Sequence, residues 1–335
     1  MTGCLCPGRT QRARRGAIGR AAVGCEDEMT MPNFFVVGAQ KAGTTSLYHY
    51  LDQHPEVFMC PAKEPHFFEG MQSDYVRPDR RLEPVTDLEA YLDLFDGVAE
   101  EKAVGEASTS YIYSRRSPSL IKQSVPDARI IAILRNPADR AYSNFLHCVR
   151  GGREPLEDFA EALRAEEARI RDRWAPLWYY RQKGYYHEQV RRYFDTFGRD
   201  RVKVFIYDDL RTRPLEVLRD MFGFLGVNEA FVPDLSVEHN TAGLPKNRRV
   251  YAMAKRLGAW NPAFKLETVD KVLPTGASRY IKSHFFAKPP PFPPEVRRML
   301  LESYREDILR LEGLIQRDLS GWLEYGTLPR AGASA

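Results

Sequence analysis

The stretch FFVVGAQKAGTTS, residues 34–46, decides how this chain folds. A short apolar run ends in Gly38, and a helical pattern follows from about Thr44 to Gln53, which predicts a strand, a glycine-rich turn and a helix. In that arrangement the backbone N–H groups of the first helical turn point at an anion, and glycines let the backbone approach it closely. The turn therefore predicts an anion site made of Lys41, Ala42, Gly43, Thr44, Thr45 and Ser46.

This loop is close to a Walker A motif but is not one. The position after Gly43 holds Thr44 where a Walker A loop has lysine, and Lys41 lies three residues earlier. An ordinary ATPase or kinase would lack its β/γ-phosphate lysine here, which disfavours that class. A glycine-rich turn without a ligand is the plainer alternative.

Strands and helices alternate along the rest of the chain. Residues 103–104, 129–134 and 201–207 have strand patterns, and residues 137–150, 155–171, 186–197, 214–225 and 294–317 have helical ones. Alternation of this kind is typical of a parallel sheet covered on both faces. We therefore expect an α/β, P-loop-like three-layer fold with a mainly parallel central sheet, formed by one domain over residues 31–325.

The ends of the chain differ from this pattern. Residues 1–30 are rich in Arg, Gly and Ala without apolar periodicity, which predicts a disordered tail or, since Met29 and Met31 precede the first strand, a stretch ahead of the true start. Residues 326–335 are expected to form a flexible C-terminal tail.

Composition limits the class of protein. The 335 residues are 43% hydrophobic and 28% charged with a net charge of +4, which fits a globular protein and is too mild to indicate a nucleic-acid partner. No apolar run approaches the roughly 18 residues that a membrane span needs. The five cysteines form neither a disulfide framework nor a zinc motif, so we expect reduced thiols and a cytoplasmic location.

A second anion site is predicted after the Ile-rich strand. Arg135 ends that strand, while Asn136 and Pro137 are a helix N-cap and first helical residue. Ser143 lies about two helical turns further on, so its hydroxyl can face the same side as the guanidinium of Arg135. Arginine and serine together suit a phosphate. An arginine that forms a surface ion pair would fit the same pattern.

A third candidate site is Lys63-Glu64-Pro65-His66-Phe67-Phe68. If this segment is extended, Glu64 and His66 lie on one face, because side chains two residues apart in a strand point the same way. A carboxylate in this position suits a general base that removes a proton from an attacking hydroxyl or amine. The alternative is a buried Glu64 neutralised by a neighbouring lysine, with His66 packed in the core.

The two anion motifs together resemble a known family. GAQKAGTTSL and LRNPADRAYSNF are similar to the 5′-phosphosulfate loop and the 3′-phosphate motif of sulfotransferases that use 3′-phosphoadenylyl sulfate (PAPS). The resemblance covers most of residues 33–325 and is nearest to the heparan sulfate N- and 3-O-sulfotransferases and their bacterial relatives. It implies PAPS as co-substrate, Glu64 as catalytic base with His66 supporting it, and Arg135 and Ser143 on the 3′-phosphate.

The resemblance also bears on a basic segment, an aromatic cluster and the end of a strand. The basic segment around Lys246 and Arg248 is similar to a lid that closes over the nucleotide, although Asn247 replaces a glycine of that lid. Tyr186, in a cluster of Trp and Tyr between residues 174 and 186, is implied to line the substrate pocket; core packing is the alternative for the cluster. Ala107 stands where several relatives have a lysine after glutamate, which weakens an assignment to heparan-like acceptors. The preceding Glu106 is a second candidate base or a residue that orders Lys41 or a loop.

The sequence thus predicts an enzyme that moves a sulfuryl group from PAPS to a hydroxyl, in preference to an amine, of a carbohydrate or small-molecule acceptor. Loose in-line transfer needs positioning and positive charge, which Lys41 supplies, and no metal is expected. The alternatives are a divergent P-loop kinase or NTPase, and a catalytically inactive module that binds a nucleotide or an anionic glycan. The residues indicate neither one acceptor nor an oligomeric state.

Overall fold

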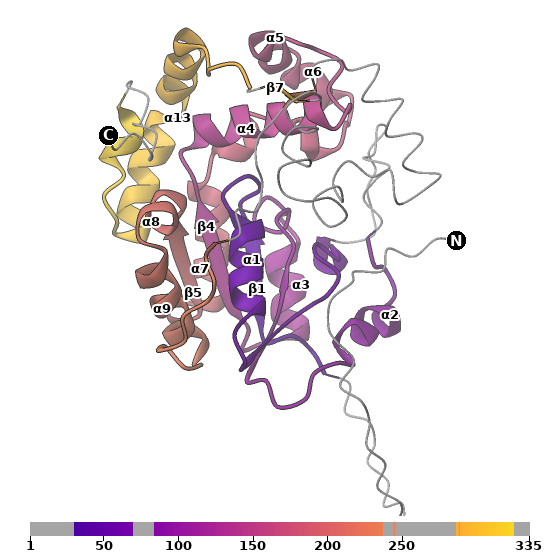
Figure 1. Ribbon diagram of the computed structural model, residues 1–335. Coiled ribbons are helices and arrows are strands. Elements are labelled where there is room, and N and C mark those ends of the chain that lie inside the picture. The colour runs from indigo at the N-terminus through magenta and orange to yellow at the C-terminus, as the bar shows by residue number, and fades with distance from the viewer. Residues whose placement is uncertain (1–29, 70–83, 237–243, 246–285, 288, 325–335) are drawn as a thin grey trace, which may run out of the picture.

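The computed structural model describes residues 30–69, 84–236, 244–245, 286–287 and 289–324. Its centre is a five-stranded sheet in the order β2-β3-β1-β4-β5 (Figure 1). The strands are β1 (Phe34–Gly38), β2 (Val57–Met59), β3 (Ala103–Ala107), β4 (Arg129–Leu134) and β5 (Val202–Ile206). Every neighbouring pair in this sheet is parallel, which confirms the predicted α/β fold.

The two central strands β1 and β3 are buried along their whole length. All five residues of β1 and of β3 are buried, as expected for central strands of a parallel sheet with helices on both faces. Gly105 of β3 is needed for this packing, because a Cβ atom there would lie 2.1 Å from the ring of Phe34. The sheet therefore fixes β1 tightly between β3 and β4.

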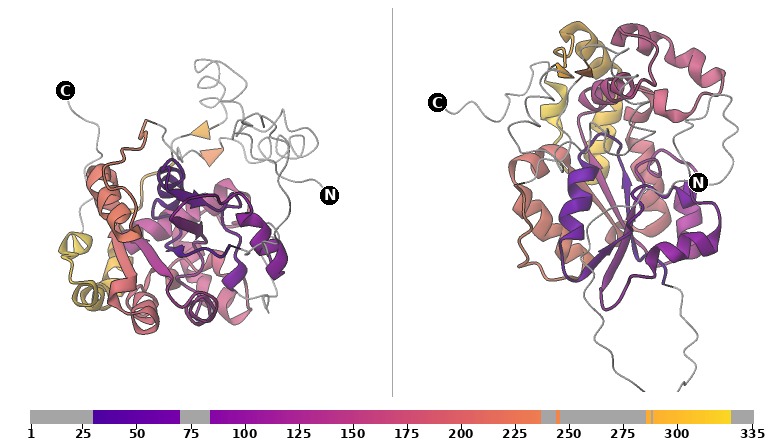
Figure 2. Two further views of the ribbon diagram at one scale, coloured as in Figure 1. Left: turned by 90° about the horizontal axis from the view of Figure 1, so that it is seen from below. Right: turned by 45° about the vertical axis from the view of Figure 1, so that its right-hand side comes forward.

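Helices cover both faces of the sheet (Figure 2). The predicted helices appear as α1 (Thr44–Asp52), α4 (Pro137–Arg150), α7 (His187–Phe197), α9 (Pro214–Leu225) and α13 (Pro294–Ile315). Five further helices are α2 (Leu88–Leu92), α3 (Ser117–Ser124), α5 (Phe159–Arg164), α6 (Glu166–Arg171) and α8 (Tyr207–Thr212). Of these, α5 and α6 take the place of the single helix predicted over 155–171. Short 3₁₀ helices are η1 (Phe67–Glu69), η2 (Asp93–Phe95), η3 (Pro176–Trp178), η4 (Gln182–Gly184), η5 (Arg199–Arg201) and η7 (Ser320–Leu323).

The structure corrects several boundaries. The helix predicted from residue 155 begins at Phe159, because the side chain of Asp158 caps it by accepting the N–H of Glu161. The strand predicted to reach Tyr207 ends at Ile206, and Tyr207 begins α8. Met299 breaks the apolar face that the helical pattern over 294–317 would bury, since it is 48% exposed. A two-residue pair of antiparallel strands, β6 (Leu244–Pro245) and β7 (Phe286–Ala287), lies outside the main sheet.

The parallel arrangement brings three loops to one edge of the sheet. The loops after β1, β3 and β4 all leave from the carboxyl ends of adjacent strands, and α4 lies across that end (Figure 1). Ligands of open α/β sheets bind at this edge. Lys246 and Arg248 lie outside the described residues, and the predicted domain limits stay predictions. Within the described part of the chain, no helix has the length and apolar character of a membrane span.

Candidate active site

The loop between β1 and α1 presents an open helix N-terminus. Gly43 is the N-cap with φ of 89°, no side chain caps the helix, and its first turn contains no acidic residue. The backbone N–H groups of this turn can therefore hold an anion. A Cβ atom at Gly43 would lie 2.7 Å from the ring of Tyr207, so both the backbone conformation and the space require glycine.

Lys41 is a half-buried cation in this loop. Burial, followed by the charges of Arg150 and Arg135, lowers the pKa of Lys41 to about 8. Its backbone has φ of 70°, in the left-handed region that side-chain-bearing residues adopt rarely. Among the described residues the ammonium has no ion pair with a carboxylate. A lysine held in this way favours a bound anion.

Arg135 lies beside the same loop. One guanidinium nitrogen donates to the carbonyl of Lys41 at 3.3 Å, and the guanidinium stacks over the ring of Tyr207 at 5.0 Å. The predicted N-cap is confirmed, since the side chain of Asn136 accepts the N–H of Ala138 at 3.0 Å. Ser143, on α4, is partly buried. The two predicted anion sites are therefore adjacent.

Tyr186 takes a supporting position. Its side chain is fully buried and its hydroxyl donates to the carbonyl of Arg135 at 3.1 Å. Burial raises the pKa of Tyr186 to about 12, so the hydroxyl stays protonated at neutral pH. This places it behind Arg135, and its assignment to the substrate pocket stays a prediction.

Glu64 and His66 meet beside a second acidic residue, Glu69. The Nε2 atom of His66 lies 3.5 Å from Oε2 of Glu64, and its Nδ1 atom lies 3.1 Å from Oε2 of Glu69. The Ser110 hydroxyl donates to Glu69 at 2.7 Å and lies 2.8 Å from Nδ1 of His66. Thr109 donates to Oε2 of Glu64 at 3.0 Å. The imidazole therefore lies between two carboxylates.

These contacts determine the charges in the cluster. Burial opposes protonation of His66, but the hydrogen bond with Glu69 and the charges of Glu64, Glu69 and Glu106 outweigh it, so the pKa of His66 lies above its usual value. Burial likewise opposes ionisation of Glu69, and the hydrogen bonds from His66 and Ser110 outweigh it and lower that pKa. The side chain of Glu64 is 28% exposed and that of His66 only 5%, so Glu64 is the member that a substrate can reach.

The backbone around Glu64 differs from the predicted extended segment. Glu64 and His66 have φ of 66° and 56°, both left-handed, and the backbone N–H of Glu64 donates to the carbonyl of Ala107 at 3.1 Å. The two side chains meet through this turn and not through strand alternation. Lys63 also lies 3.3 Å from Glu64, as the packing alternative expected, but Glu64 is not buried.

Glu106 is a fully buried carboxyl below this cluster. It accepts hydrogen bonds from the hydroxyls of Tyr91, Tyr111 and Ser108 at 3.1, 2.9 and 3.1 Å. Burial raises the pKa of Glu106 to about 7. The hydroxyl of Ser108 in turn accepts the backbone N–H of His66 at 3.1 Å. Glu106 therefore orders the loop that carries the cluster and has no open path to a substrate.

Comparison with known proteins identifies the family of this site. The family model described as "Sulfotransferase family" matches residues 32–231, which contain the loop, Arg135 and the Glu64 cluster. The chain belongs to the sulfotransferase family. A crystal structure of a sulfotransferase from Alicyclobacillus acidocaldarius is 38% identical with a TM-score of 0.68, over 88% of this chain and 100% of that one.

Curated animal sulfotransferases are also similar to this chain. The mouse bifunctional heparan sulfate N-deacetylase/N-sulfotransferase 4 is 27% identical over 311 residues, which are 88% of this chain and 31% of the relative. Human carbohydrate sulfotransferase 15 is 31% identical over 168 residues, 40% of this chain and 30% of the relative. The chain thus spans about a third of the length of the curated relatives that it matches.

Sequence reasoning missed three residues of this sulfotransferase site. Glu69 follows His66 by three residues, and that spacing within one turn was its only signal. Tyr207 was assigned to a strand, although it packs under Gly43 and Arg135. Lys183 was not considered, and its ammonium donates to the side chain of Gln40 in the donor loop at 2.8 Å.

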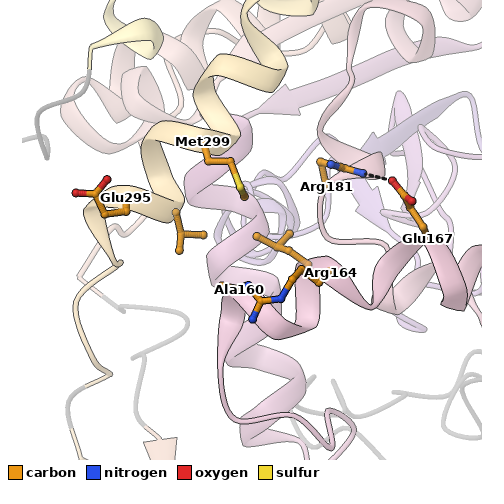
Figure 3. Close-up of a pocket in the computed structure, with 8 residues that line it drawn as sticks. Ala160, Arg164, Glu167, Arg181, Glu295 and Met299 are labelled. Atoms are coloured by element: carbon orange, nitrogen blue, oxygen red, sulfur yellow. Dashed lines mark hydrogen bonds and ion pairs between the residues drawn. The ribbon is translucent and has the colours of Figure 1, made fainter.

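A separate cavity of about 470 Å³ lies between α5, α6, η4 and the start of α13 (Figure 3). It is lined by Ala160, Leu163, Arg164, Glu167, Arg181, Glu295, Val296 and Met299, and Arg181 forms an ion pair with Glu167 at 3.1 Å across it. None of the predicted site residues lines this cavity. In the described ranges, no group of three His, Cys, Asp or Glu side chains is arranged to hold a metal ion.

Proposed function

We propose that this sulfotransferase moves a sulfuryl group from PAPS to a hydroxyl of a carbohydrate or small-molecule acceptor, with Glu64 as general base. One observation carries the proposal: a cationic anion-binding loop and an accessible carboxylate lie at the same edge of the sheet. The link between them is direct, because the carbonyl of Thr109 packs against Gly38 of the loop while its hydroxyl holds Glu64.

The described residues fit a donor with phosphate groups at both ends. The uncapped first turn of α1 and Lys41 provide donors and charge for the 5′ end. The guanidinium of Arg135, held between Tyr207 and the Lys41 carbonyl, provides a fork for the 3′-phosphate. When bound, PAPS supplies the sulfuryl group and its bisphosphate leaving group.

The cluster around Glu64 supports proton removal from the acceptor. As the acceptor oxygen bonds to sulfur and the sulfur–phosphate oxygen bond breaks, Glu64 takes the hydroxyl proton. His66, lying between Glu64 and Glu69, fixes the carboxylate by its position, and Thr109 fixes it from the other side. Lys41 stabilises the negative charge that gathers on the leaving oxygen.

The relatives support a carbohydrate as the acceptor class. Two relatives that are similar to this chain are named as a heparan sulfate N-deacetylase/N-sulfotransferase and a carbohydrate sulfotransferase. A hydroxyl and an amine must both lose a proton as they attack, and a carboxylate base suits either; we propose the hydroxyl as the acceptor group.

The first test is thermal melting of the full chain with 3′-phosphoadenosine 5′-phosphate (PAP), ADP or ATP-Mg²⁺. We expect stabilisation by PAP above that by ADP, and Arg135→Ala to weaken PAP binding about 10- to 100-fold, the range for a hydrogen-bonded charged group. Equal or larger stabilisation by ATP-Mg²⁺ would instead indicate a kinase or NTPase, and no response to any nucleotide would contradict a PAPS enzyme.

The second test concerns catalysis. Panels of oligosaccharides and small hydroxyl compounds are incubated with PAPS, and PAP release is measured by mass spectrometry. Glu64→Gln should keep PAP affinity and lose transfer by at least about 100-fold. Glu302→Gln, on the exposed side of α13, is the matched control and should transfer normally. Full transfer by Glu64→Gln would rule out Glu64 as the base.

A further inference from the structure

Lys183 is a buried lysine that the proposed chemistry has not used. It lies in η4, is 7% exposed, and its ammonium donates to Oε1 of Gln40 at 2.8 Å. Gln40 directly precedes Lys41 in the donor loop, although 143 residues separate it from Lys183. Burying a lysine costs side-chain entropy and desolvation, so a buried ammonium that contacts the donor loop from another element requires a compensating role.

The backbone that carries Lys183 is held by three different helices. The carboxylate of Glu166 in α6 accepts the N–H groups of Arg181 and of the next residue, both at 2.7 Å. The hydroxyl of Tyr304 in α13 donates to the carbonyl of Arg181 at 2.7 Å. The amide of Gln189 in α7 donates to the carbonyl of Lys183 at 3.2 Å. The position of this lysine is therefore preorganised.

The charges around Lys183 favour an anion. Burial and then the charge of Arg140 lower the pKa of Lys183 to about 8, while the charges of Glu69 and Glu64 act in the opposite direction. Arg140 is 1% exposed, and its Nε and Nη1 atoms have no hydrogen-bond partner among the described residues. Two buried cations thus influence each other's charge beside the donor loop, and Arg140 has unused donors.

We infer that Lys183 is a second catalytic cation, which contacts the sulfuryl group of the bound donor on the side of Gln40 and assists Lys41. This inference rests on the proposed function. Lys183 keeps its proton throughout the step: the acceptor oxygen–sulfur bond forms, the bond from sulfur to the leaving phosphate oxygen breaks, and the acceptor proton goes to Glu64. The ammonium stabilises charge on the non-bridging sulfuryl oxygens, and Gln40 holds it in place before the donor binds.

The inference predicts that loss of Lys183 changes the affinity for PAPS but not that for PAP, two ligands that differ only by the sulfuryl group. Affinities for PAP and for PAPS are measured by calorimetry with Lys183→Met, Lys183→Arg, Gln40→Ala and the control Lys102→Met, whose lysine is exposed at the opposite edge of the sheet. We expect Lys183→Met to bind PAP within about twofold of wild type and PAPS about 10- to 100-fold more weakly. Lys183→Arg should recover part of the PAPS affinity, and Lys102→Met should bind both ligands normally.

Three results would overturn the inference. The first is an equal loss of PAP and PAPS affinity in Lys183→Met, and the second is no loss of either affinity. The third is a loss of PAPS affinity in Gln40→Ala as selective as that in Lys183→Met, because the lysine would then only support Gln40. Circular dichroism checks that Lys183→Met is folded, and Lys183→Gln replaces it if it is not. Failure of wild type to bind PAP would contradict the proposed function instead, so the two failures are distinguishable.

Once an acceptor is found, kinetics give an independent readout. Loss of a group that stabilises developing charge lowers kcat by about 100- to 1000-fold, whereas a structural support for the loop would mainly raise the KM for PAPS. We expect Lys183→Met to lower kcat in this way in addition to its weaker PAPS binding, and an unchanged kcat would overturn the inference.

Discussion

Raising the pH from 7 to 9 should weaken PAP binding through Lys41. Burial, and then the charges of Arg150 and Arg135, lower the pKa of this lysine to about 8 in the free protein. A bound phosphate stabilises the ammonium, so binding raises the pKa of Lys41 and takes up a proton. The affinity is therefore fully present below the free pKa of about 8 and is lost as the pH rises through it.

The size of this effect follows from the titration of one group. With a free pKa of about 8, the dissociation constant rises about tenfold between pH 7 and 9, or about 1.4 kcal/mol, whereas an ordinary lysine would change it by only a few per cent. The second ionisation of a phosphate monoester has a pKa of about 6, so the phosphate groups of PAP are mostly dianionic at pH 7 and contribute little to the change between pH 7 and 9.

Calorimetry at constant ionic strength between pH 7 and 9.5 measures the dependence, and two buffers of different ionisation enthalpy report the proton uptake. Lys41→Arg should bind PAP with little pH dependence, because a guanidinium stays charged throughout. Lys41→Met should bind weakly at every pH. Affinity that is flat to pH 9.5 in wild type, or equally steep in Lys41→Arg, would refute the assignment. Lys183→Met should retain the slope, since Lys183 contacts only the sulfuryl group.

Three further predictions concern the support of the site. The first is Glu106→Gln. Burial raises the folded pKa of Glu106 to about 7, so the wild type loses stability as the pH rises from 5 through 7, and the variant lacks this loss. Urea unfolding should show the difference in free energy of unfolding between the two proteins changing by roughly 3 kcal/mol over this range. Gly43→Ala should lower PAP affinity at least about tenfold in melting assays, because the new Cβ atom displaces the ring of Tyr207, over which the guanidinium of Arg135 stacks. Glu154→Ala should lower the urea-derived free energy of unfolding by about 3 to 5 kcal/mol, since it leaves the buried guanidinium of Arg169 without its carboxylate.

The elements next to the donor site could be predicted because their signals are local. The apolar run of β1, its glycines and the start of α1 are contiguous, and so are β4 and the Asn136–Pro137 start of α4. A mainly parallel sheet also places the loops after these strands at one edge, because parallel strands end on the same side. By contrast, β2 has only three residues and gives too little periodicity to detect.

The contacts within the site could not be predicted in the same way. Lys183 reaches Gln40 across 143 residues, and Ser110 reaches Glu69 across 41, so no spacing rule connects them. The role of Tyr207 could not be predicted because the alternating pattern of β5 continues into this residue. In the structure the strand ends at Ile206, and Tyr207 begins α8. Burial changes the pKa of Lys41 and Glu106 only after the fold has enclosed them.

The backbone conformation of the predicted catalytic residues also depends on the fold. Lys41, Glu64 and His66 all have left-handed φ, which costs roughly 1–3 kcal/mol per residue and which each residue type would avoid in a free chain. Tertiary contacts hold these turns: the N–H of Glu64 donates to Ala107 of β3, and the N–H of His66 donates to the Ser108 hydroxyl. Since Glu106 accepts from that hydroxyl, a buried carboxyl without access to substrate helps to fix the orientation of the base. The stability of the core and the geometry of catalysis are therefore coupled through β3, and substitutions there should change transfer without touching either substrate.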